Sequence, residues 1–445
     1  MARTIANELL EQKLAESLAA RHPARTARTA RDVRVPDMPE KAVAVIGVRR
    51  AGKTSLMHRL IQERIAAGDE PTTHLLLSLE DERLVGMTAA DLGWLIDEHR
   101  RRQPTHSDDR QVSVYLDEIQ LVEGWATLVR RLLDARATRV FVSGSSAKLL
   151  SREIGTSLRG RAMEVVVYPF SFREALRHVG REPMQRWAAL TPDARAEVQR
   201  ALHGYLHTGG FPEAQTVDAR DRGALLRSYV DVMVLRDVID RHAVSNPEAL
   251  RRLQRHLLSN PAARFSVSKM YNDFRSQGLT VSKDTLYAYL AHLEDAFLVR
   301  PTSLFTASDR QRAVNPRNSY PIDHGLIPLY ERAGRESTGH ALEALVRIEL
   351  ERRGCTVSWA RGEGDVEVDF VAENASAAPT FIQVCVDVSA EATWHREVRA
   401  LEQLLADHPH ALGLLLTLDA APPARPLPPR VRWCSAAEWL LDQNA

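Results

Sequence analysis

The sequence predicts an α/β protein with a parallel sheet, then a mostly helical region, then a second mixed α/β domain. Between Lys41 and about Met163, apolar runs typical of strands alternate with helical patterns. This alternation indicates a parallel sheet covered by helices on both faces. From Ser171 to Asn246 the pattern is almost wholly helical, and the final part of the chain returns to mixed α and β patterns.

Bulk composition favours a soluble, cytoplasmic protein. The 445 residues suffice for about two to four domains, and 44% hydrophobic with 26% charged content is typical of globular chains. Cys355, Cys385 and Cys434 form no CxxC pair, which favours a reducing cytosol. No apolar run approaches the ~20 residues that span a bilayer, so we expect no membrane partner. The net charge of +1 means that any DNA contact must come from a local patch.

Residues 1–40 are expected to form a helix followed by an arginine-rich arm. The opening stretch MARTIANELLEQKLAESLAA lacks the apolar centre of a signal peptide and indicates an amphipathic helix. After it, arginines recur at every third position, at Arg25, Arg28, Arg31 and Arg34. Two interpretations stay open, a solvated linker and a basic arm that touches phosphates.

The parallel sheet is expected within residues 41–170. Apolar runs of strand length predict its strands at Ala42–Ile46, His74–Leu79, Val112–Leu116, Arg139–Ser143 and Met163–Tyr168.

The stretch GVRRAGKT, between the first expected strand and a helix, fits the phosphate-binding pattern G-x-x-x-x-G-K-[ST]. Gly47 and Gly52 let the backbone curl, so that amides as far as Ser55 point at an anion beside the positive end of the helix dipole. Lys53 is expected against the β and γ phosphates, and the Thr54 hydroxyl is expected to ligate Mg²⁺. We therefore expect ATP and Mg²⁺ as ligands.

Two later strands end in polar side chains that suit the same site. In VSVYLDEIQ, Asp117 is expected to hold Mg²⁺ through water, and Glu118 is expected to orient and deprotonate the attacking water. In VFVSGSS, the strand ends in Ser143, Ser145 and Ser146, whose side chains are placed to sense the γ-phosphate. The alternative is that these small residues serve only to form the turn.

Further blocks accompany these motifs, namely LLLSLEDERL, VFVSGSSAKLLSREIGTSLRGRAMEVVVYPFSFREAL and YLHTGGFPEA. With GVRRAGKTSL and YLDEIQLVEGW, they resemble the prokaryotic AAA+ ATPases that carry a C-terminal restriction-endonuclease-like domain. The resemblance runs from about Lys41 to about Leu418. It implies an AAA+ P-loop core with strand order 5-1-4-3-2, a helical lid at 171–246, and assembly into a ring, such as a hexamer, or into another homo-oligomer.

The resemblance also implies an arginine that reaches the nucleotide of a neighbouring subunit. In this chain that residue lies in SLRGRAME, just before the fifth strand. Arg161 is the first choice and Arg159 the second, and the alternative is that both are ordinary surface arginines. Arg236, in the lid region, is a weaker candidate for a γ-phosphate contact within one subunit.

Residues 247–335 look like a winged-helix domain. Ser266 and Ser282 are expected to cap two helices, and Gly278 to form the turn between them. The helical period of the second helix turns four side chains outward as candidates for DNA contact, namely Lys283, Thr285, Tyr287 and His292. The alternative is a module that only packs against the lid.

Residues 336–445 resemble the restriction-endonuclease-like fold, whose active pattern is D…(D/E)-x-K. The positions of that pattern, with an acid on the preceding helix, fall on Glu343, Asp369, Gln383 and Cys385. An amide and a thiol therefore replace the acid and the lysine, so we expect no cutting. Asp387 is expected on the same face of the strand, where it could partly substitute for the missing acid. An active nuclease therefore stays as an alternative.

Together these features predict an oligomeric, Mg²⁺-dependent AAA+ ATPase that couples ATP hydrolysis to DNA binding, remodelling or translocation. Branched DNA is one expected substrate, by analogy with junction-cutting nucleases of similar fold. A nucleotide-dependent signalling or defence switch and an ATP-regulated nuclease are the alternatives.

Overall fold

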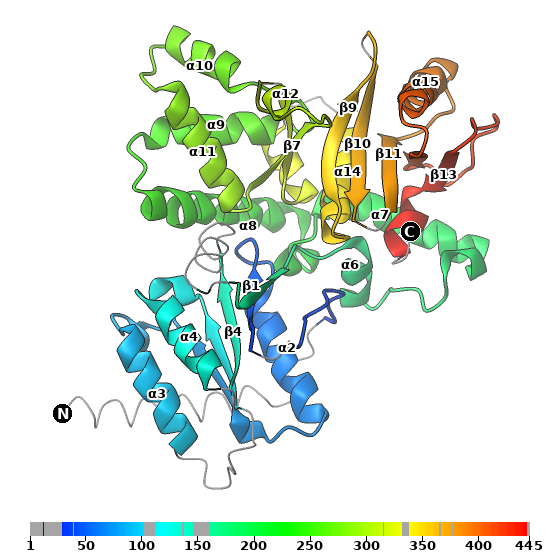
Figure 1. Ribbon diagram of the computed structural model, residues 1–445. Coiled ribbons are helices and arrows are strands. Elements are labelled where there is room, and N and C mark those ends of the chain that lie inside the picture. Colours follow the sequence, from blue (N-terminus) through cyan, green and yellow to red (C-terminus); the bar gives the residue numbers. More distant parts are fainter. Residues whose placement is uncertain are drawn as a thin grey trace. The chain divides into compact units, whose positions relative to one another are not determined.

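The computed structural model separates into two compact units, Met1–Val167 and Tyr168–Ala445, and each is described by itself (Figure 1). The structure describes residues 12, 29–38, 40–101, 112–135, 138–145, 158, 160–314, 316–331, 338–364, 366–375 and 377–442.

The N-terminal unit is built on a five-stranded parallel sheet with strand order β2-β3-β4-β1-β5. Its strands are β1 (Ala42–Ile46), β2 (His74–Ser78), β3 (Val112–Asp117), β4 (Thr138–Gly144) and β5 (Ala162–Val166). The predicted order 5-1-4-3-2 is confirmed, and the predicted strand bounds agree to within two residues. Every residue of β1 and β3 is buried, as expected for strands covered on both faces.

Helices cover this sheet on both sides, since Figure 1 shows α3 and α4 on one side and α2 on the other. Their bounds are α2 (Lys53–Ala66), α3 (Ala89–Arg101) and α4 (Trp125–Asp134). α2 turns Leu56, Met57 and Ile61 into the core. Met57 and Ile61 have the i, i+4 spacing of one helix face, and Leu56 lies beside them. The first residue of α2 directly follows the phosphate loop, so packing of this apolar face fixes where the loop lies.

The C-terminal unit contains an eight-stranded mixed sheet with strand order β13-β12-β11-β10-β9-β7-β8-β6. The short strands β6–β8 are mutually antiparallel, and β7 then pairs in parallel with β9, which joins them to the larger part. The strands are β6 (Arg264–Phe265), β7 (Val299–Leu304), β8 (Arg317–Pro321), β9 (Thr356–Arg361), β10 (Glu367–Asn374), β11 (Ala377–Cys385), β12 (Leu412–Thr417) and β13 (Val431–Ser435).

Helices dominate the first half of this unit, as the sequence predicts. They are α6 (Phe172–His178), α7 (Pro192–Thr208), α8 (Ala219–Val232), the π-helix η7 (Met233–Asp240), α9 (Pro247–Ser259), α10 (Val267–Ser276) and α11 (Lys283–Asp295). The later helices are α12 (Asp309–Val314), α13 (Ile327–Tyr330), α14 (Thr338–Arg352), α15 (Glu391–Asp407) and α16 (Ala436–Leu441). The Ser266 and Ser282 side chains cap α10 and α11, as predicted. Among the described helices, none combines the length and the hydropathy needed to cross a bilayer.

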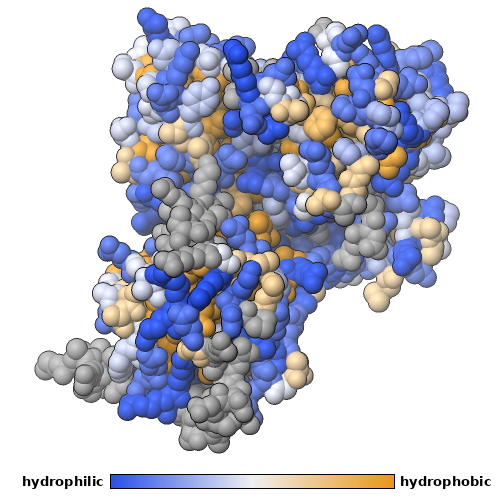
Figure 2. Space-filling model, viewed as in Figure 1, coloured by the Kyte–Doolittle hydropathy of each residue, from blue (hydrophilic) through white to orange (hydrophobic). Residues whose placement is uncertain are grey.

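Two separate cores lie on opposite faces of the β10–β12 part of the sheet. On one face Phe370, Ile382 and Leu414 pack with α14, α7 and α16. On the other face Phe381 and Leu415 pack with α15. Alternate residues of each strand thus serve different cores, as the two-residue period of a strand requires. Hydrophilic residues cover most of the surface that is visible in Figure 2.

A buried carboxylate, Asp323, ties the end of α7 to the start of α13. It accepts hydrogen bonds from the backbone N–H of Gly210 (2.6 Å) and of Gly325 (2.9 Å). A Cβ on Gly210 would lie 2.3 Å from the carbonyl oxygen of Phe170, so only glycine fits there. The YLHTGGFPEA block therefore has a structural reason for its paired glycines.

We expect Asp323→Ala to destabilise the C-terminal unit, because it leaves two buried N–H groups without an acceptor. Each such group costs about 1–3 kcal/mol. Urea unfolding of the full chain would measure the loss. Asp309→Ala is the control, since the Asp309 side chain is 96% exposed. Equal unfolding free energies for the two variants would contradict this role.

Candidate active site

The loop between β1 and α2 has a backbone that only glycine allows at two positions. Gly52 caps α2 with a φ of 98°, and Gly47 has a φ of 147°. A Cβ on Gly47 would lie 2.2 Å from the carbonyl oxygen of Val167. β5 therefore holds the loop at its start, and the first turn of α2 holds it at its end.

Lys53 folds back into this loop and is 5% exposed. Its ammonium donates hydrogen bonds to the carbonyl oxygens of Gly47 (3.1 Å) and Val48 (3.3 Å). It also lies 3.7 Å from a carboxylate oxygen of Glu118. A buried ammonium with these partners is held inside the curl of the loop, where an anion would meet it.

Asp117 links the loop to the ends of two other strands. Thr54 Oγ1 donates to its Oδ2 at 2.6 Å, and Ser143 Oγ donates to its Oδ1. β4, which carries Ser143, lies between β3 and β1 in the sheet. The serine thus bridges the gap between the strand that delivers the acid and the strand that leads into the loop.

Glu118 follows Asp117 in the left-handed region, with a φ of 56°. Its N–H donates to Ser143 Oγ at 3.0 Å, and Gln120 Nε2 donates to its carboxylate at 2.5 Å. Such a backbone is costly for a residue other than glycine, and it turns Glu118 away from the line of the strand. The Asp117 carboxylate therefore contacts Thr54, and the Glu118 carboxylate lies near Lys53.

The serines predicted for this site have different surroundings. Ser143 and Ser145 are fully buried, whereas Ser55 is exposed at the start of α2. Ser143 is hydrogen-bonded to both Asp117 and Glu118, the two residues that carry the carboxylates. These contacts are those of a residue that positions its neighbours. Ser146 lies outside the described residues.

The predicted arginines are only partly described. Arg161 is half exposed and pairs with Asp134 at 2.5 Å, while Arg159 lies outside the described residues. Arg236, in the C-terminal unit, is 68% exposed and lies 3.6 Å from Asp240.

The four side chains of α11 that were predicted to point outward differ in exposure. Lys283 is exposed, with its ammonium 5.4 Å from the centre of the Tyr271 ring, and Tyr287 is 47% exposed. Thr285 is partly buried and lies 2.8 Å from the Ser282 hydroxyl. His292 is also partly buried, and its ring stacks on the ring of His242 at a centroid distance of 3.7 Å.

The four nuclease-pattern residues all line one cleft of about 750 Å³ in the C-terminal unit. Glu343 comes from α14, Asp369 from β10, and Gln383 and Cys385 from β11. The pairing of β10 with β9 shifts register between Val368 and Val371, so Asp369 lies in an irregular part of this ladder.

Sequence reasoning missed a fifth residue of this cleft, Glu397 on α15. It is buried, and its carboxylate accepts hydrogen bonds from Gln383 Nε2 and from the Arg396 guanidinium. The sequence does contain a signal for Glu397, because it is an acidic residue on the apolar face of an amphipathic helix, between Trp394 and Leu401.

The side chains of this cleft do not fit a metal ion. Asp369 accepts from the N–H of Val384 at 2.8 Å, and Gln383 is bonded to Glu397. In the part of the chain that the structure describes, no group of three His, Cys, Asp or Glu side chains is arranged for a metal. Asp387 does not replace a ligand, because its exposed carboxylate accepts from Ser389 N–H (2.8 Å) and Oγ (2.6 Å).

Burial raises the pKa values of three groups in the cleft. It raises the pKa of Asp369 to about 7, with the Glu397 charge adding to the shift against the opposing Val384 hydrogen bond. Burial and the charges of Asp369 and Glu397 also raise the pKa of Glu343 well above the ordinary value. Burial likewise raises the pKa of the Cys385 thiol, which stays neutral. Protonated carboxyls and a thiol are poor partners for a divalent cation.

Comparison with known proteins assigns the chain to a family. It is 30% identical over 383 residues to the uncharacterized protein MJ1544 of Methanocaldococcus jannaschii, covering 85% of this chain and 81% of that protein. The chain belongs to the MJ1544 family. An uncharacterized protein of Haemophilus influenzae is 29% identical over 348 residues, covering 77% of this chain and 82% of that protein.

Residues 39–176 of this MJ1544-family chain match the family model described as an AAA domain. Residues 199–335 match a model described as a domain of unknown function. The predicted AAA+ core is thus confirmed at the level of the domain, and it contains both the phosphate loop and the Asp117–Glu118 pair.

Solved structures show weaker likeness to the MJ1544-family chain. The Walker-type ATPase PABY2304 of Pyrococcus abyssi has a TM-score of 0.42 at 16% identity, covering 73% of this chain and 95% of that one. PCH-2 of C. elegans has a TM-score of 0.23 at 18% identity, covering 39% and 44%. Scores this low do not establish a shared overall arrangement.

The raised pKa of Asp369 predicts a pH-dependent stability of the C-terminal unit. The folded state holds a proton that the unfolded chain releases near pH ~4. This contribution is therefore fully present below about pH 4 and is lost as the pH rises through about 7. We expect Asp369→Asn to flatten the decline in unfolding free energy between pH 5 and 8, measured by urea titration at each pH.

Asp387→Asn is the matched control. Hydrogen bonds from Ser389 lower the pKa of Asp387, so its contribution changes only in more acidic solution and with the opposite sign. Parallel stability profiles for the wild type and Asp369→Asn would contradict the assignment.

Proposed function

We propose that the N-terminal unit binds ATP with Mg²⁺ and hydrolyses it. The 2.6 Å contact between Thr54 Oγ1 and Asp117 Oδ2 carries this proposal. It brings a hydroxyl at the start of the phosphate-loop helix onto a carboxylate at the end of β3. A hydroxyl and a carboxylate held together beside a phosphate loop are the oxygen donors that Mg²⁺ prefers.

The surrounding residues fit a triphosphate. The glycine curl and the first amides of α2 offer N–H donors to an anion, and Lys53 adds a buried positive charge. When bound, Mg²⁺ supplies charge that offsets the phosphate oxygens. Glu118 orients and deprotonates the attacking water, while Ser143 fixes the backbone from which both acids extend.

We propose that the protein works as a homo-oligomer, a ring such as a hexamer, in which Arg161 or Arg159 reaches a neighbour's nucleotide. The half-exposed guanidinium of Arg161, paired only at the surface with Asp134, supports this role. A cation that meets phosphate charge in the transition state raises turnover more than affinity.

We propose DNA as the partner of the C-terminal unit. The order α9, β6, α10, α11, β7, β8 and the antiparallel pairing of these strands support a winged helix. Its second helix, α11, exposes Lys283 and Tyr287, a cation and an aromatic ring suited to phosphate and base contacts. Hydrolysis then remodels DNA or moves the protein along it.

The helix-strand-strand-strand-helix-strand order from α14 to β12 supports the restriction-endonuclease-like fold for the last part of the chain. The cleft chemistry disfavours cutting, because its carboxyls are hydrogen-bonded or protonated and its thiol is neutral. We propose that this part contributes to DNA contact without cleavage.

We expect Glu118→Gln to bind ATP with near-normal affinity and to lower its turnover by about 10²-fold or more, because an amide cannot accept the proton from water. Calorimetry and phosphate release would measure binding and turnover. Lys53→Ala, which removes the buried charge, should lose binding itself. Normal ATP affinity in Lys53→Ala would overturn the site assignment.

The experiment that tests the whole proposal measures ATP turnover with no DNA, single-stranded, duplex and four-way DNA, alongside molecular mass with and without nucleotide. We expect DNA to stimulate turnover with a steep salt dependence. Lys283→Ala should weaken stimulation without changing the basal rate. Tight nucleotide retention without stimulation would favour the switch instead, and Mg²⁺-dependent cleavage lost in Asp369→Ala would favour the nuclease.

A further inference from the structure

Apolar side chains fix the turn that follows β3. Glu118 caps the 3₁₀ helix η4 (Ile119–Leu121), and its carbonyl oxygen accepts a hydrogen bond from the N–H of Leu121 at 3.1 Å. Ile119 and Val122 are buried on either side of Gln120 in the sequence. Burial of these two side chains in the core gives the backbone of Gln120 a fixed place beside Glu118.

The Glu118 carboxylate has a different partner at each oxygen. Oε2 accepts a hydrogen bond from Gln120 Nε2 at 2.5 Å, whereas Oε1 lies 3.7 Å from the Lys53 ammonium. The second distance exceeds that of a hydrogen bond. Among the described residues, Gln120 is therefore the one hydrogen-bond donor to this carboxylate. The Glu118 side chain is 9% exposed, so solvent offers little to replace that donor.

Gln120 selects an orientation that the Glu118 side chain alone leaves open. The last torsion of a glutamate side chain is broad and roughly two-fold, so it does not determine where the carboxylate oxygens face. A donor bound to one oxygen does determine it. Ser143 Oγ meanwhile accepts a hydrogen bond from the N–H of Glu118. The backbone and the carboxylate of Glu118 thus have separate supports, Ser143 for the first and Gln120 for the second.

We propose that Gln120 is a positioning residue for ATP hydrolysis, which orients the Glu118 carboxylate through Oε2 and leaves Oε1 to the attacking water. This inference rests on the proposed ATP site. When Lys53 meets the phosphates, its ammonium leaves Glu118, whereas the amide of Gln120 has no charge for the phosphates to attract. A general base acts only where it is aimed at the proton that it accepts.

The test begins with Gln120→Met, which keeps an unbranched side chain of similar length and has no N–H donor. We expect kcat for ATP hydrolysis to fall about tenfold or more, as the loss of a hydrogen bond to a charged group does. The Kd for ATP with Mg²⁺ should stay within about twofold, because the amide binds Glu118 and not the phosphate loop. Phosphate release and titration calorimetry on the full chain would measure the two quantities.

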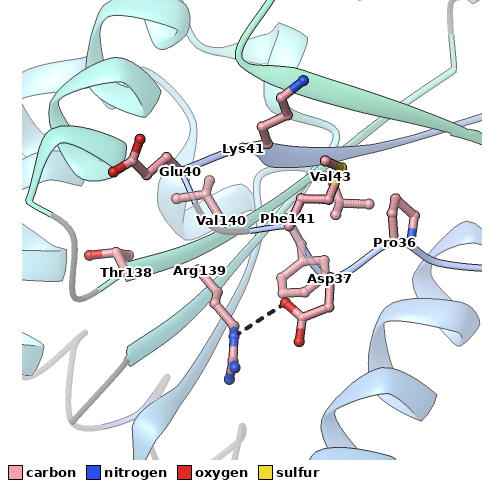
Figure 3. Close-up of a pocket in the computed structure, with 10 residues that line it drawn as sticks. Pro36, Asp37, Glu40, Lys41, Val43, Thr138, Arg139, Val140 and Phe141 are labelled. Carbon is pink, nitrogen blue, oxygen red and sulfur yellow. Dashed lines mark ion pairs between the residues drawn. The ribbon is translucent and has the colours of Figure 1, made fainter. Parts of the chain in front are cut away.

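Two control variants alter the same unit away from the Glu118 carboxylate. Leu121→Ala changes the neighbouring position of the same turn, where the side chain is 57% exposed. Asp37→Asn weakens an ion pair, since Asp37 lies 3.5 Å from Arg139 beside a cavity of about 180 Å³ (Figure 3). Arg139 lies near the start of β4 and Glu118 follows the end of the parallel strand β3, so the two residues are at opposite edges of the sheet. Both variants should keep kcat within about twofold of the wild type.

The double variant distinguishes a positioning role from a structural one. If Gln120 acts through Glu118, Gln120→Met should lower single-turnover hydrolysis no further once Glu118→Gln is present. Losses that multiply in the double variant would overturn the inference, as would a kcat for Gln120→Met equal to or above that of the wild type.

Gln120→Asn covers the case in which Gln120→Met folds poorly. Asparagine keeps the amide but shortens its reach by one methylene, so we expect kcat to fall with it as well, and an unchanged kcat would overturn the inference. A wild-type protein without ATP turnover would overturn the proposed function and this role with it, whereas the outcomes above overturn the role alone.

Discussion

The proposed nucleotide site depends on the carboxylate of Asp117, which accepts hydrogen bonds from Thr54 and Ser143. These contacts join three parts of the chain that the sequence separates widely, namely the ends of β3 and β4 and the start of α2. Because the carboxylate and the serine are buried, their bonds hold at distances that water does not loosen. Every role assigned to Lys53 and Glu118 presumes this framework.

The sequence predicts the N-terminal unit well because its motifs are local. The phosphate loop is a continuous stretch with obligatory glycines, and each parallel strand is a short apolar run between helical patterns. The close approach of Gly47 to Val167, however, joins the residues that directly follow β1 and β5. The sequence therefore predicts that glycine is needed there without showing which neighbour excludes a side chain.

Some contacts depend on packing between distant segments, so the sequence does not show them. His292 has the period of an exposed helix position, yet its ring stacks on His242 beyond the end of η7. Glu397 joins Gln383 only because α15 covers that face of β11. Arg31 belongs to a stretch whose composition is that of a linker, and the hydrophobic residues Val33 and Val35 place it against the core.

The pairing of β7 with β9 has a mechanical consequence. Through Ser303 opposite Ser358 and Leu304 opposite Trp359, the small antiparallel sheet and the large mixed sheet share one hydrogen-bonded ladder. Because α11 packs against β7 and Asp369 lies on β10, a displacement of α11 would act on a strand that backbone hydrogen bonds link, through β9, to the strand that carries Asp369.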